Sequence, residues 1–355
     1  MPRALRIARR SLTLTLPLVF GAACAGGSAP NPVPLTRGPE VTLPRVRALL
    51  ETIAHDSMEG RRAGSPGYAR AARFVASEMR RIGLTPAGDS GFFQRIAAIR
   101  PPRGRMVVLP SFAAWDTVPP EQRLLDVNVL GLVEGVDPLL KHEVVVMAAH
   151  LDHLGISAHA SGDSIHNGAD DDASGVVTVL EAARVLMAGP RPKRTVVFAL
   201  FTGEEGGPSG SRWYLEHPVR PFSSHVAQLQ VEMVGRPDPM AGGRGKMWLT
   251  GYERSTMGEI LTAAGVLVAK DPHPEAEFFR RSDNFKFAIA GIPAHTYSSY
   301  GMHTDYHQPG DDASTIDWAH FVSAVDGGAR AIRILADGQK PAWKPNGIPI
   351  PPPPR

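Results

Sequence analysis

The fold is decided by the stretch from residue 144 to residue 201, which opens with VVVMAAH (144–150) and closes with TVVFALF (195–201). Both runs are short, continuous and rich in valine, which is typical of strands buried on both faces. Between them, ASGVVTVLEAARVLMA (173–188) predicts a helix. A strand, a helix and a strand in this order indicate an α/β domain with one central sheet.

The same alternation continues on both sides of this stretch. Further strands are predicted at VNVLGLV (127–133), AQLQVEMV (227–234) and IPAHTYS (292–298), and further helices at residues 66–82 and about 314–335. The first of these helices has Pro66 at its start and Gly83 at its end, the residues that favour a helix beginning and a helix end. We expect one domain at residues 41–338, with a mixed, mostly parallel sheet flanked by helices on both faces.

The first 24 residues carry the features of an export signal. Four arginines precede an apolar run of roughly a dozen residues, which is too short to span a bilayer as a helix. Cys24, the single cysteine of the chain, ends this run and resembles the acylation site of a bacterial lipoprotein, although Gly21 replaces the usual leucine three residues before it. The location expected from these features is the periplasm or the outer membrane through a lipid anchor, or otherwise secretion.

The segments next to the predicted domain are rich in proline and carry no apolar period. Residues 25–40 read as a flexible linker and residues 339–355 as an extended tail. The formal net charge of +3 comes mainly from the four arginines near the N-terminus. The rest of the chain has no basic block with interleaved aromatic residues, so nucleic acid is not expected as a partner.

Polar residues with metal-binding chemistry follow the predicted strands. His150 ends one strand and Asp152 lies two residues later, at the edge where open α/β sheets place their ligands. NGADDDASG (167–175) then crowds three carboxylates into a short loop before a helix. Like charges this close favour a bound cation, although Asp172 or Ser174 could instead cap the helix.

Three further segments add carboxylates and histidines. TGEEGGPSGS (202–211) places the adjacent acids Glu204 and Glu205 after a strand, and Glu232 interrupts an apolar strand. HTDYHQPGDD (303–312) contains His303 and His307, which are equally suitable ligands on spacing alone. A set of nitrogen and oxygen ligands without cysteine suits catalytic zinc, or manganese or cobalt, better than a structural zinc site.

The ordered series of motifs resembles the M28 family of zinc aminopeptidases, whose relatives include glutamate carboxypeptidases and glutaminyl cyclases. The resemblance runs from about residue 49 to residue 335 and includes NVLGLVEG, HLDH, NGADDDASG, GEEGGPSGS and DYHQPGDD. It implies a zinc-peptidase fold of the phosphorylase/hydrolase-like type and an aminopeptidase that acts on peptide substrates. A single-zinc cyclotransferase of the glutaminyl cyclase type, a carboxypeptidase or dipeptidase, and a non-catalytic scaffold are the alternatives.

The resemblance also implies a role for each site residue. Two zinc ions would be held by five ligands, with Asp171 as the bridge: His150, Asp171, Glu205, Glu232 and His307. Asp152 would orient the imidazole of His150, and Glu204 would act as the general base. Tyr306 would stabilise the oxyanion, and His153 would be structural. A cis peptide is expected between Asp171 and Asp172.

One ligand position departs from the family pattern. Glu232 stands where the family usually has aspartate, so this ligand is one methylene longer. Neither this change nor Asn284, which replaces a familiar histidine, removes a coordinating group from the chain.

Overall fold

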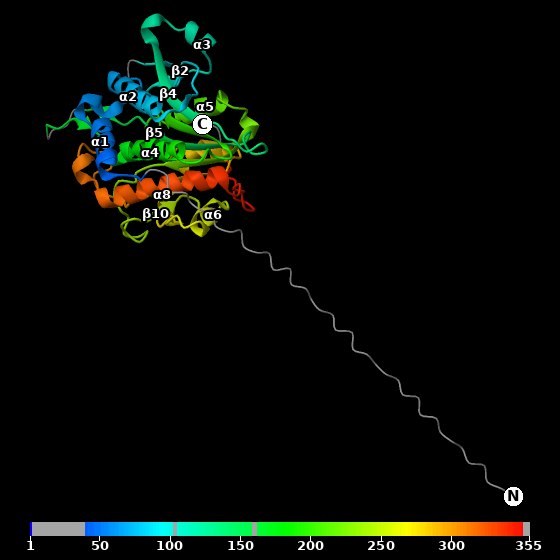
Figure 1. Cartoon of the computed structure of the whole chain (residues 1–355). Helices are drawn as coiled ribbons and strands as arrows, with labels where there is room; N and C mark the ends of the chain where they lie inside the picture. Colours follow the sequence, from blue (N-terminus) through cyan, green and yellow to red (C-terminus); the bar gives the residue numbers. More distant parts are fainter. Residues whose placement is uncertain (2–39, 102–104, 158–161, 351–355) are drawn as a thin grey trace. The chain divides into compact units, whose positions relative to one another are not determined.

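The computed structural model describes Met1 and residues 40–101, 105–157 and 162–350. From residue 40 onward these residues belong to one compact unit, Pro34–Arg355 (Figure 1). The predicted signal peptide, Cys24 and the linker as far as residue 39 lie outside the described residues, as do the last five residues of the predicted tail. The boundaries of the predicted domains stay predictions.

A ten-stranded sheet forms the centre of the unit. Its strands follow the order β11-β10-β12-β9-β5-β8-β4-β2-β3, with β1 paired to β4. The bounds are β1 (Thr85–Pro86), β2 (Phe93–Ile99), β3 (Val107–Val108), β4 (Arg123–Val133), β5 (Val144–His150), β8 (Thr195–Phe201), β9 (His225–Val231), β10 (Met247–Leu249), β11 (Val268–Lys270) and β12 (Ala294–Ser298). A separate small ribbon pairs β6 (Gly155–Ile156) with β7 (Ile165–His166).

The predicted α/β class with a mixed sheet is confirmed, and the structure shows where each kind of pairing lies. Strands β12, β9, β5 and β8 run parallel to their neighbours in that row, and β10 runs parallel to β11. The strands from β8 through β4 and β2 to β3 are antiparallel, as are the pairs β1–β4 and β10–β12. Parallel pairing is concentrated in the middle of the sheet. The expectation that the sheet is mostly parallel is wrong, because five of its pairings are antiparallel and four are parallel.

Helices cover both faces of the sheet. One layer contains α1 (Leu43–Ile53), α2 (Pro66–Ile82), α4 (Gly175–Ala188) and α8 (Trp318–Asp337), and the opposite face is covered by α5 (Ser209–Glu216) and α7 (Asn284–Ile289) (Figure 1). Two further helices lie next to edge-side strands: α3 (Phe112–Asp116) contacts β2, and α6 (Met257–Ala263) contacts β11. The predicted helix at residues 66–82 has the same bounds as α2, where Ser65 accepts a hydrogen bond from the Tyr68 amide and Gly83 adopts φ +90°.

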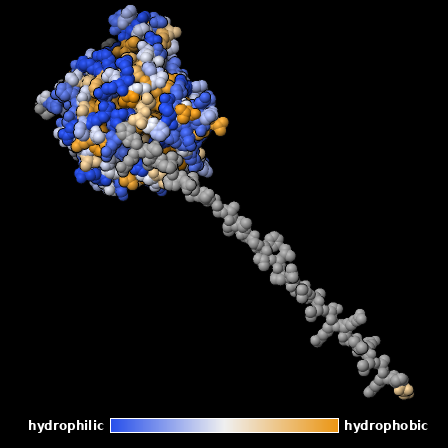
Figure 2. All heavy atoms as spheres, in the orientation of Figure 1, coloured by the Kyte–Doolittle hydropathy of each residue, from blue (hydrophilic) through white to orange (hydrophobic). Residues whose placement is uncertain are grey.

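The valine-rich strand β5 shows why such a run needs two helical layers. Val145 and Met147 pack into the core under α4 and α8, whereas Val144 and Val146 pack into the core on the α5 and α7 side. Every residue of β5 is buried. Because successive side chains of a strand point to opposite faces, only an apolar run without alternation fills both cores. On the face seen in Figure 2, hydrophobic residues lie scattered among hydrophilic ones, which is normal for a protein surface.

A buried histidine in β12 makes the stability of this fold depend on pH. His295 donates from Nδ1 to the Thr250 carbonyl oxygen at 2.7 Å and accepts from the Ser255 hydroxyl at Nε2 at 2.6 Å. Burial lowers the pKa of His295 to about 4. In the unfolded chain the histidine pKa is about 6.5, so the unfolded state binds a proton between pH 6.5 and 4 that the folded state does not bind.

We therefore expect His295 to reduce stability progressively as the pH falls from about 6.5 to about 4. Replacing it (His295→Gln) should flatten the dependence of the unfolding free energy on pH in this window by at most about 1.4 kcal/mol per pH unit. Urea denaturation at several pH values measures this slope. The exposed His142→Gln is the control, and an unchanged slope in the His295 variant would contradict the assignment.

Candidate metal centre

The polar residues of the site meet where three central strands end. His150 is the last residue of β5, Glu204 and Glu205 lie in the turn after β8, and Glu232 follows β9. These strands are neighbours and run parallel, so their carboxyl ends lie at one edge of the sheet. Open α/β sheets bind their ligands at this edge. The parallel centre of the sheet thus brings together residues that are more than eighty positions apart in the chain.

The three adjacent aspartates before α4 have separate partners. Asp170 accepts from the Gly235 amide at 2.7 Å and lies 3.1 Å from Nε2 of His303. Asp172 accepts from the Gly175 and Met233 amides at 3.0 and 3.1 Å, which ties the helix start to β9. The expected helix-capping role therefore falls to Asp172, and the remaining carboxylate, Asp171, is left for the site. The peptide bond between Asp171 and Asp172 is cis, as the resemblance implied.

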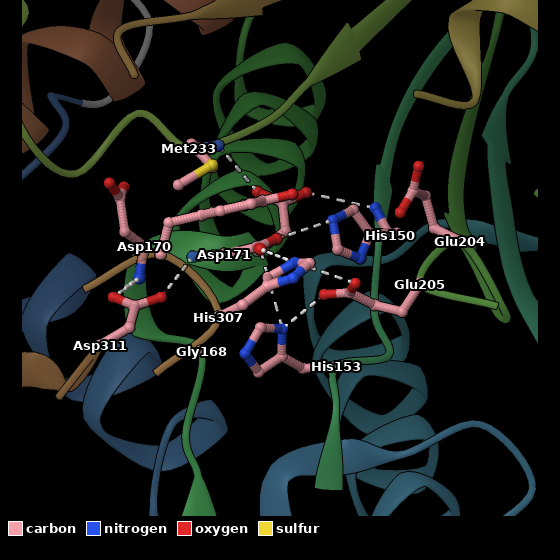
Figure 3. A network of polar contacts seen from close by, with 12 residues as sticks. His150, His153, Gly168, Asp170, Asp171, Glu204, Glu205, Met233, His307 and Asp311 are labelled. Carbon is pink, nitrogen blue, oxygen red and sulfur yellow. Dashed lines mark hydrogen bonds and ion pairs between the residues drawn. The ribbon is translucent and has the colours of Figure 1, made fainter. Parts of the chain in front are cut away.

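Asp171 lies at the middle of the cluster, with a histidine beside each of its carboxylate oxygens. Its Oδ1 is 3.1 Å from Nε2 of His150, and its Oδ2 is 3.3 Å from Nε2 of His307. Figure 3 shows the side chains of both histidines and of Glu205 turned towards this carboxylate. A carboxylate whose two oxygens face different ligand residues has the arrangement that a bridging ligand between two metal ions needs.

Glu205 connects the other side of the cluster. Its Oε1 accepts from Nδ1 of His153 at 2.7 Å, and its Oε2 lies 3.1 Å from Nε2 of His307. Burial and the nearby Asp171 oppose ionisation of Glu205, but the neighbouring His153 and His307 outweigh them and lower the pKa of Glu205 to about 2. Glu205 is therefore held ionised by its neighbours.

The donor atoms of this cluster fit a cation. Nε2 of His150, Nε2 of His307 and Oε2 of Glu232 are buried and lack a hydrogen-bond partner among the described residues. The Nδ1 of His150 donates to the Asp152 carbonyl oxygen at 3.0 Å, so in the neutral ring Nε2 carries a free lone pair. Buried polar atoms normally have hydrogen-bond partners. A bound metal ion would provide a partner for these three atoms.

Two groups of ligand atoms are close enough to share a metal ion, and both contain Asp171. The first joins His150, Asp171 and Glu232, with their ligand atoms within 4.8 Å of one another, and the second joins His153, Asp171 and Glu205. Nitrogen and carboxylate oxygen are the ligands of catalytic zinc. The longer side chain of Glu232 thus still reaches the group that contains His150.

The structure adds His153, which sequence reasoning assigned to a structural role. Its Nδ1 is 3.9 Å from Asp171 Oδ2, and its ring meets that of His307 edge-on at 5.8 Å. The signal in the sequence is HLDH, which places a second histidine three residues after His150. His303, by contrast, lies against Asp170 and Arg236, so the structure separates it from His307.

Two residues beside the cluster have contacts that bear on their predicted roles. Asp152 contacts His150 mainly through its backbone carbonyl, since its Oδ1 is 3.9 Å from the imidazole Nδ1. That Oδ1 accepts instead from the Glu204 amide at 3.1 Å. Tyr306 stacks on the His307 ring at 3.8 Å, and its hydroxyl lies 3.5 Å from the Arg281 guanidinium. Asp152 therefore braces the turn with Glu204, and Tyr306 braces His307.

The concentration of acids perturbs their ionisation. Burial raises the pKa of Glu232 to about 7 and that of Glu204 well above its ordinary value; nearby carboxylates add to both shifts, although His150 opposes them. Several carboxylates this close together can all be ionised only if positive charge lies among them. A divalent cation supplies that charge and favours the ionised ligands.

One buried arginine holds the loops around the cluster. The Arg61 guanidinium donates to the carbonyl oxygens of Leu151 and Gly168 at 3.0 Å each, and to those of Ile53 and Asn167 at 3.0 and 2.6 Å. On the other side, Asp311 accepts from the amides of Asp170 and Asp171 at 2.9 and 3.0 Å. The backbone that presents Asp171 is thus fixed from two sides, and Figure 3 shows the contacts on the side of Asp311.

Comparison with known proteins places this geometry in a family. The model of peptidase family M28 matches residues 128–330, which contain β5, β8, β9 and all five predicted metal ligands. The chain belongs to peptidase family M28. This membership confirms the predicted family and the enzyme class that goes with it, a zinc metallopeptidase.

Relatives of the M28 chain agree with this class. A probable zinc metalloprotease of Leptosphaeria maculans is 33% identical over 173 residues, which are 48% of this chain and 35% of that protein. The zinc aminopeptidase BSAP of Bacillus subtilis superposes with a TM-score of 0.59 at 16% identity, over 84% of this chain and 96% of that one. The match to the Leptosphaeria maculans protein spans only about a third of that protein. The match to BSAP, at 16% identity, shows a shared fold.

The predicted location is contradicted by a further relative. A vacuolar membrane protease of Phaeosphaeria nodorum is 36% identical over 113 residues, which are 31% of this chain and 10% of that protein. Its name, shared by other fungal relatives, refers to the vacuolar membrane and not to the periplasm, the outer membrane or the outside of the cell. Among the described residues of this chain, no helix is long and apolar enough to cross a membrane.

Removing the guanidinium of Arg61 tests the role of this anchor. We expect Arg61→Met to lower the free energy of unfolding by about 3 kcal/mol or more, because several buried carbonyl oxygens lose their donor. The matched control is Arg212→Met, which removes a side chain that is 48% exposed and 3.9 Å from Glu216; it should change stability by less than about 0.5 kcal/mol. Urea denaturation measures both, and equal effects would contradict the anchoring role.

Proposed function

We propose that this M28 chain is a metal-dependent exopeptidase, most specifically an aminopeptidase that removes N-terminal residues from peptides with two zinc ions bound. The observation that carries the proposal is the pair of ligand groups that share Asp171, with Glu204 beside them and a hollow next to them. A single-ion site would need only one of the two groups. This arrangement favours the dizinc peptidase over the single-zinc cyclotransferase.

In this proposal, His150 and Glu232 would hold one ion, Glu205 and His307 would hold the other, and Asp171 would be a ligand of both. Manganese or cobalt could replace zinc in a site of nitrogen and oxygen ligands. When bound, the ions lower the pKa of water towards neutrality and polarise the scissile carbonyl. The protein contributes ligands that are already in place, since Arg61 and Asp311 fix the loop of Asp171.

Glu204 is the proposed general base. Its carboxylate lines the hollow together with the ligands Glu205 and Glu232 but belongs to neither ligand group, so it is free to move a proton. Its backbone amide is held by Asp152, and the raised pKa brings its proton affinity closer to that of the leaving amine. Glu204 would take a proton from the attacking water and pass it to the amine that leaves.

Tyr306 is the proposed donor to the oxyanion. It lines the same hollow, and its ring is held against His307 while its hydroxyl stays near Arg281. A hydroxyl held beside the reacting carbonyl would stabilise the negative charge that develops on the oxygen.

Replacing Glu204 separates proton transfer from metal binding. We expect Glu204→Gln to lower kcat on aminoacyl p-nitroanilides by about 10²- to 10⁴-fold, because the amide cannot accept the proton. Metal content, measured by plasma mass spectrometry, should equal that of the wild type. The control is Glu253→Gln, whose side chain is 65% exposed. A Glu204→Gln enzyme with wild-type kcat would remove Glu204 from the mechanism.

Metal stoichiometry tests the two-ion proposal and distinguishes His307 from His153. We expect about two zinc ions per chain, falling to about one in Glu232→Ala and in His307→Ala, with His153→Ala retaining two. The experiment is elemental analysis after dialysis against a fixed free zinc concentration. One ion in the wild type would favour the cyclotransferase alternative. Loss of an ion in His153→Ala but not in His307→Ala would transfer the ligand role to His153.

A further inference from the structure

A hollow opens beside the metal-binding residues, and its far wall is made of side chains without a part in metal binding. Asp171, Glu204, Glu205, Glu232 and His307 line one side of it. The other side is lined by Trp248, Phe278, Arg281, Tyr300 and Tyr306. The hollow has an empty volume of about 480 Å³, part of which is open to solvent.

The far wall is built as a stack. The Arg281 guanidinium lies over the Phe278 ring at 5.0 Å, and the Phe278 ring stacks on the Trp248 indole at 5.4 Å with an interplanar angle of 28°. Tyr300 meets Phe278 edge-on at 5.6 Å. Because a guanidinium is attracted to an aromatic face, Phe278 fixes the position of the charge of Arg281. The stack therefore places the Arg281 guanidinium and the Trp248 indole on the same wall.

The Trp248 indole N–H lacks an acceptor among the described residues, and the Arg281 guanidinium lacks a charged one. Trp248 is 2% exposed, and its Nε1 has no hydrogen-bond partner in the described part of the chain. In the same part of the chain, the contacts of the Arg281 guanidinium are the Phe278 ring and, at 3.5 Å, the Tyr306 hydroxyl, neither of which carries negative charge. A buried N–H without a partner is costly, and it rejects a guest that cannot accept a hydrogen bond.

The aromatic rings by themselves would suit an apolar substrate side chain. The donors of Trp248 and Arg281 make an apolar side chain unfavourable. An apolar guest would leave the indole N–H of Trp248 unpaired and would desolvate the charge of Arg281. A guest with a carboxylate would satisfy both donors while its methylene groups pack against Phe278. Arginine and an N–H donor together are typical of carboxylate recognition.

We propose that this hollow selects substrates whose N-terminal residue is acidic, glutamate or aspartate, with Arg281 and Trp248 as the specificity-determining residues. The proposal rests on the proposed aminopeptidase function, because it assigns the hollow to the side chain of the residue that is cleaved off. It makes the protein an aminopeptidase for acidic N-termini.

The first test compares substrates on the full, zinc-loaded chain. We expect kcat/KM for glutamyl p-nitroanilide to exceed those for the glutaminyl and leucyl substrates by about tenfold or more, since only the first offers a charged acceptor. In Arg281→Gln the ratio of the glutamyl to the glutaminyl value should fall about tenfold. The adjacent Arg280→Gln is the matched control, because Arg280 lies outside the hollow and 44% of its side chain is exposed; it should keep the wild-type ratio.

The second test measures binding without turnover and separates this proposal from the proposed function. Titration calorimetry on the zinc-loaded Glu204→Gln chain should show tighter binding of glutamic acid α-amide than of leucinamide. Trp248→Phe, which keeps a ring but removes the N–H, should reduce that preference. A preference for leucine in both tests, or an unchanged ratio in Arg281→Gln, would overturn the acidic specificity. The two proposals can also fail separately. If the glutamic acid amide binds more tightly but the zinc-loaded wild-type chain hydrolyses no nitroanilide, the acidic preference of the hollow is supported and the aminopeptidase function is refuted.

Discussion

Four carboxylates lie in or beside one ligand cluster, and the structure around them is arranged to hold this concentrated negative charge. Asp171, Glu204, Glu205 and Glu232 all line the same hollow. Two of them, Glu204 and Glu232, have raised pKa values because burial and their neighbours oppose ionisation. Such a group is stable as an ionised set only with positive charge among its members, since like charges at short range repel one another. Bound metal ions are the natural source of that charge.

The parallel middle of the sheet is the element that creates this cluster. Strands β5, β8 and β9 end at the same edge, so a residue placed directly after each strand arrives within reach of the others. The loop of the three aspartates then adds Asp171, while Asp170 and Asp172 are taken up by backbone and side-chain contacts elsewhere. Arg61 and Asp311 fix this loop through backbone groups only, which leaves the side chain of Asp171 free for the site.

The far wall of the hollow has a different chemical character from the metal-binding wall. One side presents oxygen and nitrogen ligands with lone pairs, and the other presents the donors Trp248 and Arg281. A substrate in this space would therefore meet acceptors on one side and donors on the other. The aromatic stack through Phe278 keeps the donor side in place by ring contacts, with no carboxylate partner among the described residues that would neutralise Arg281.

Much of this protein was determined by the sequence alone, because local patterns report local structure. The valine-rich runs identified β5 and β8, Pro66 and Gly83 bounded α2, and the ordered motifs identified the family. The antiparallel side of the sheet was not visible in this way, because pairing direction depends on how loops return the chain.

Only the tertiary structure decided which of several similar residues lie together. It assigned Asp170, Asp171 and Asp172 to different partners, separated His303 from His307, and brought His153 to Glu205. It also joined Trp248 to Arg281 through Phe278, across more than thirty residues of sequence. Residue type and spacing state which atoms can bind a metal or a substrate, but the distance between atoms from different strands is set by the packing of the sheet and its helices.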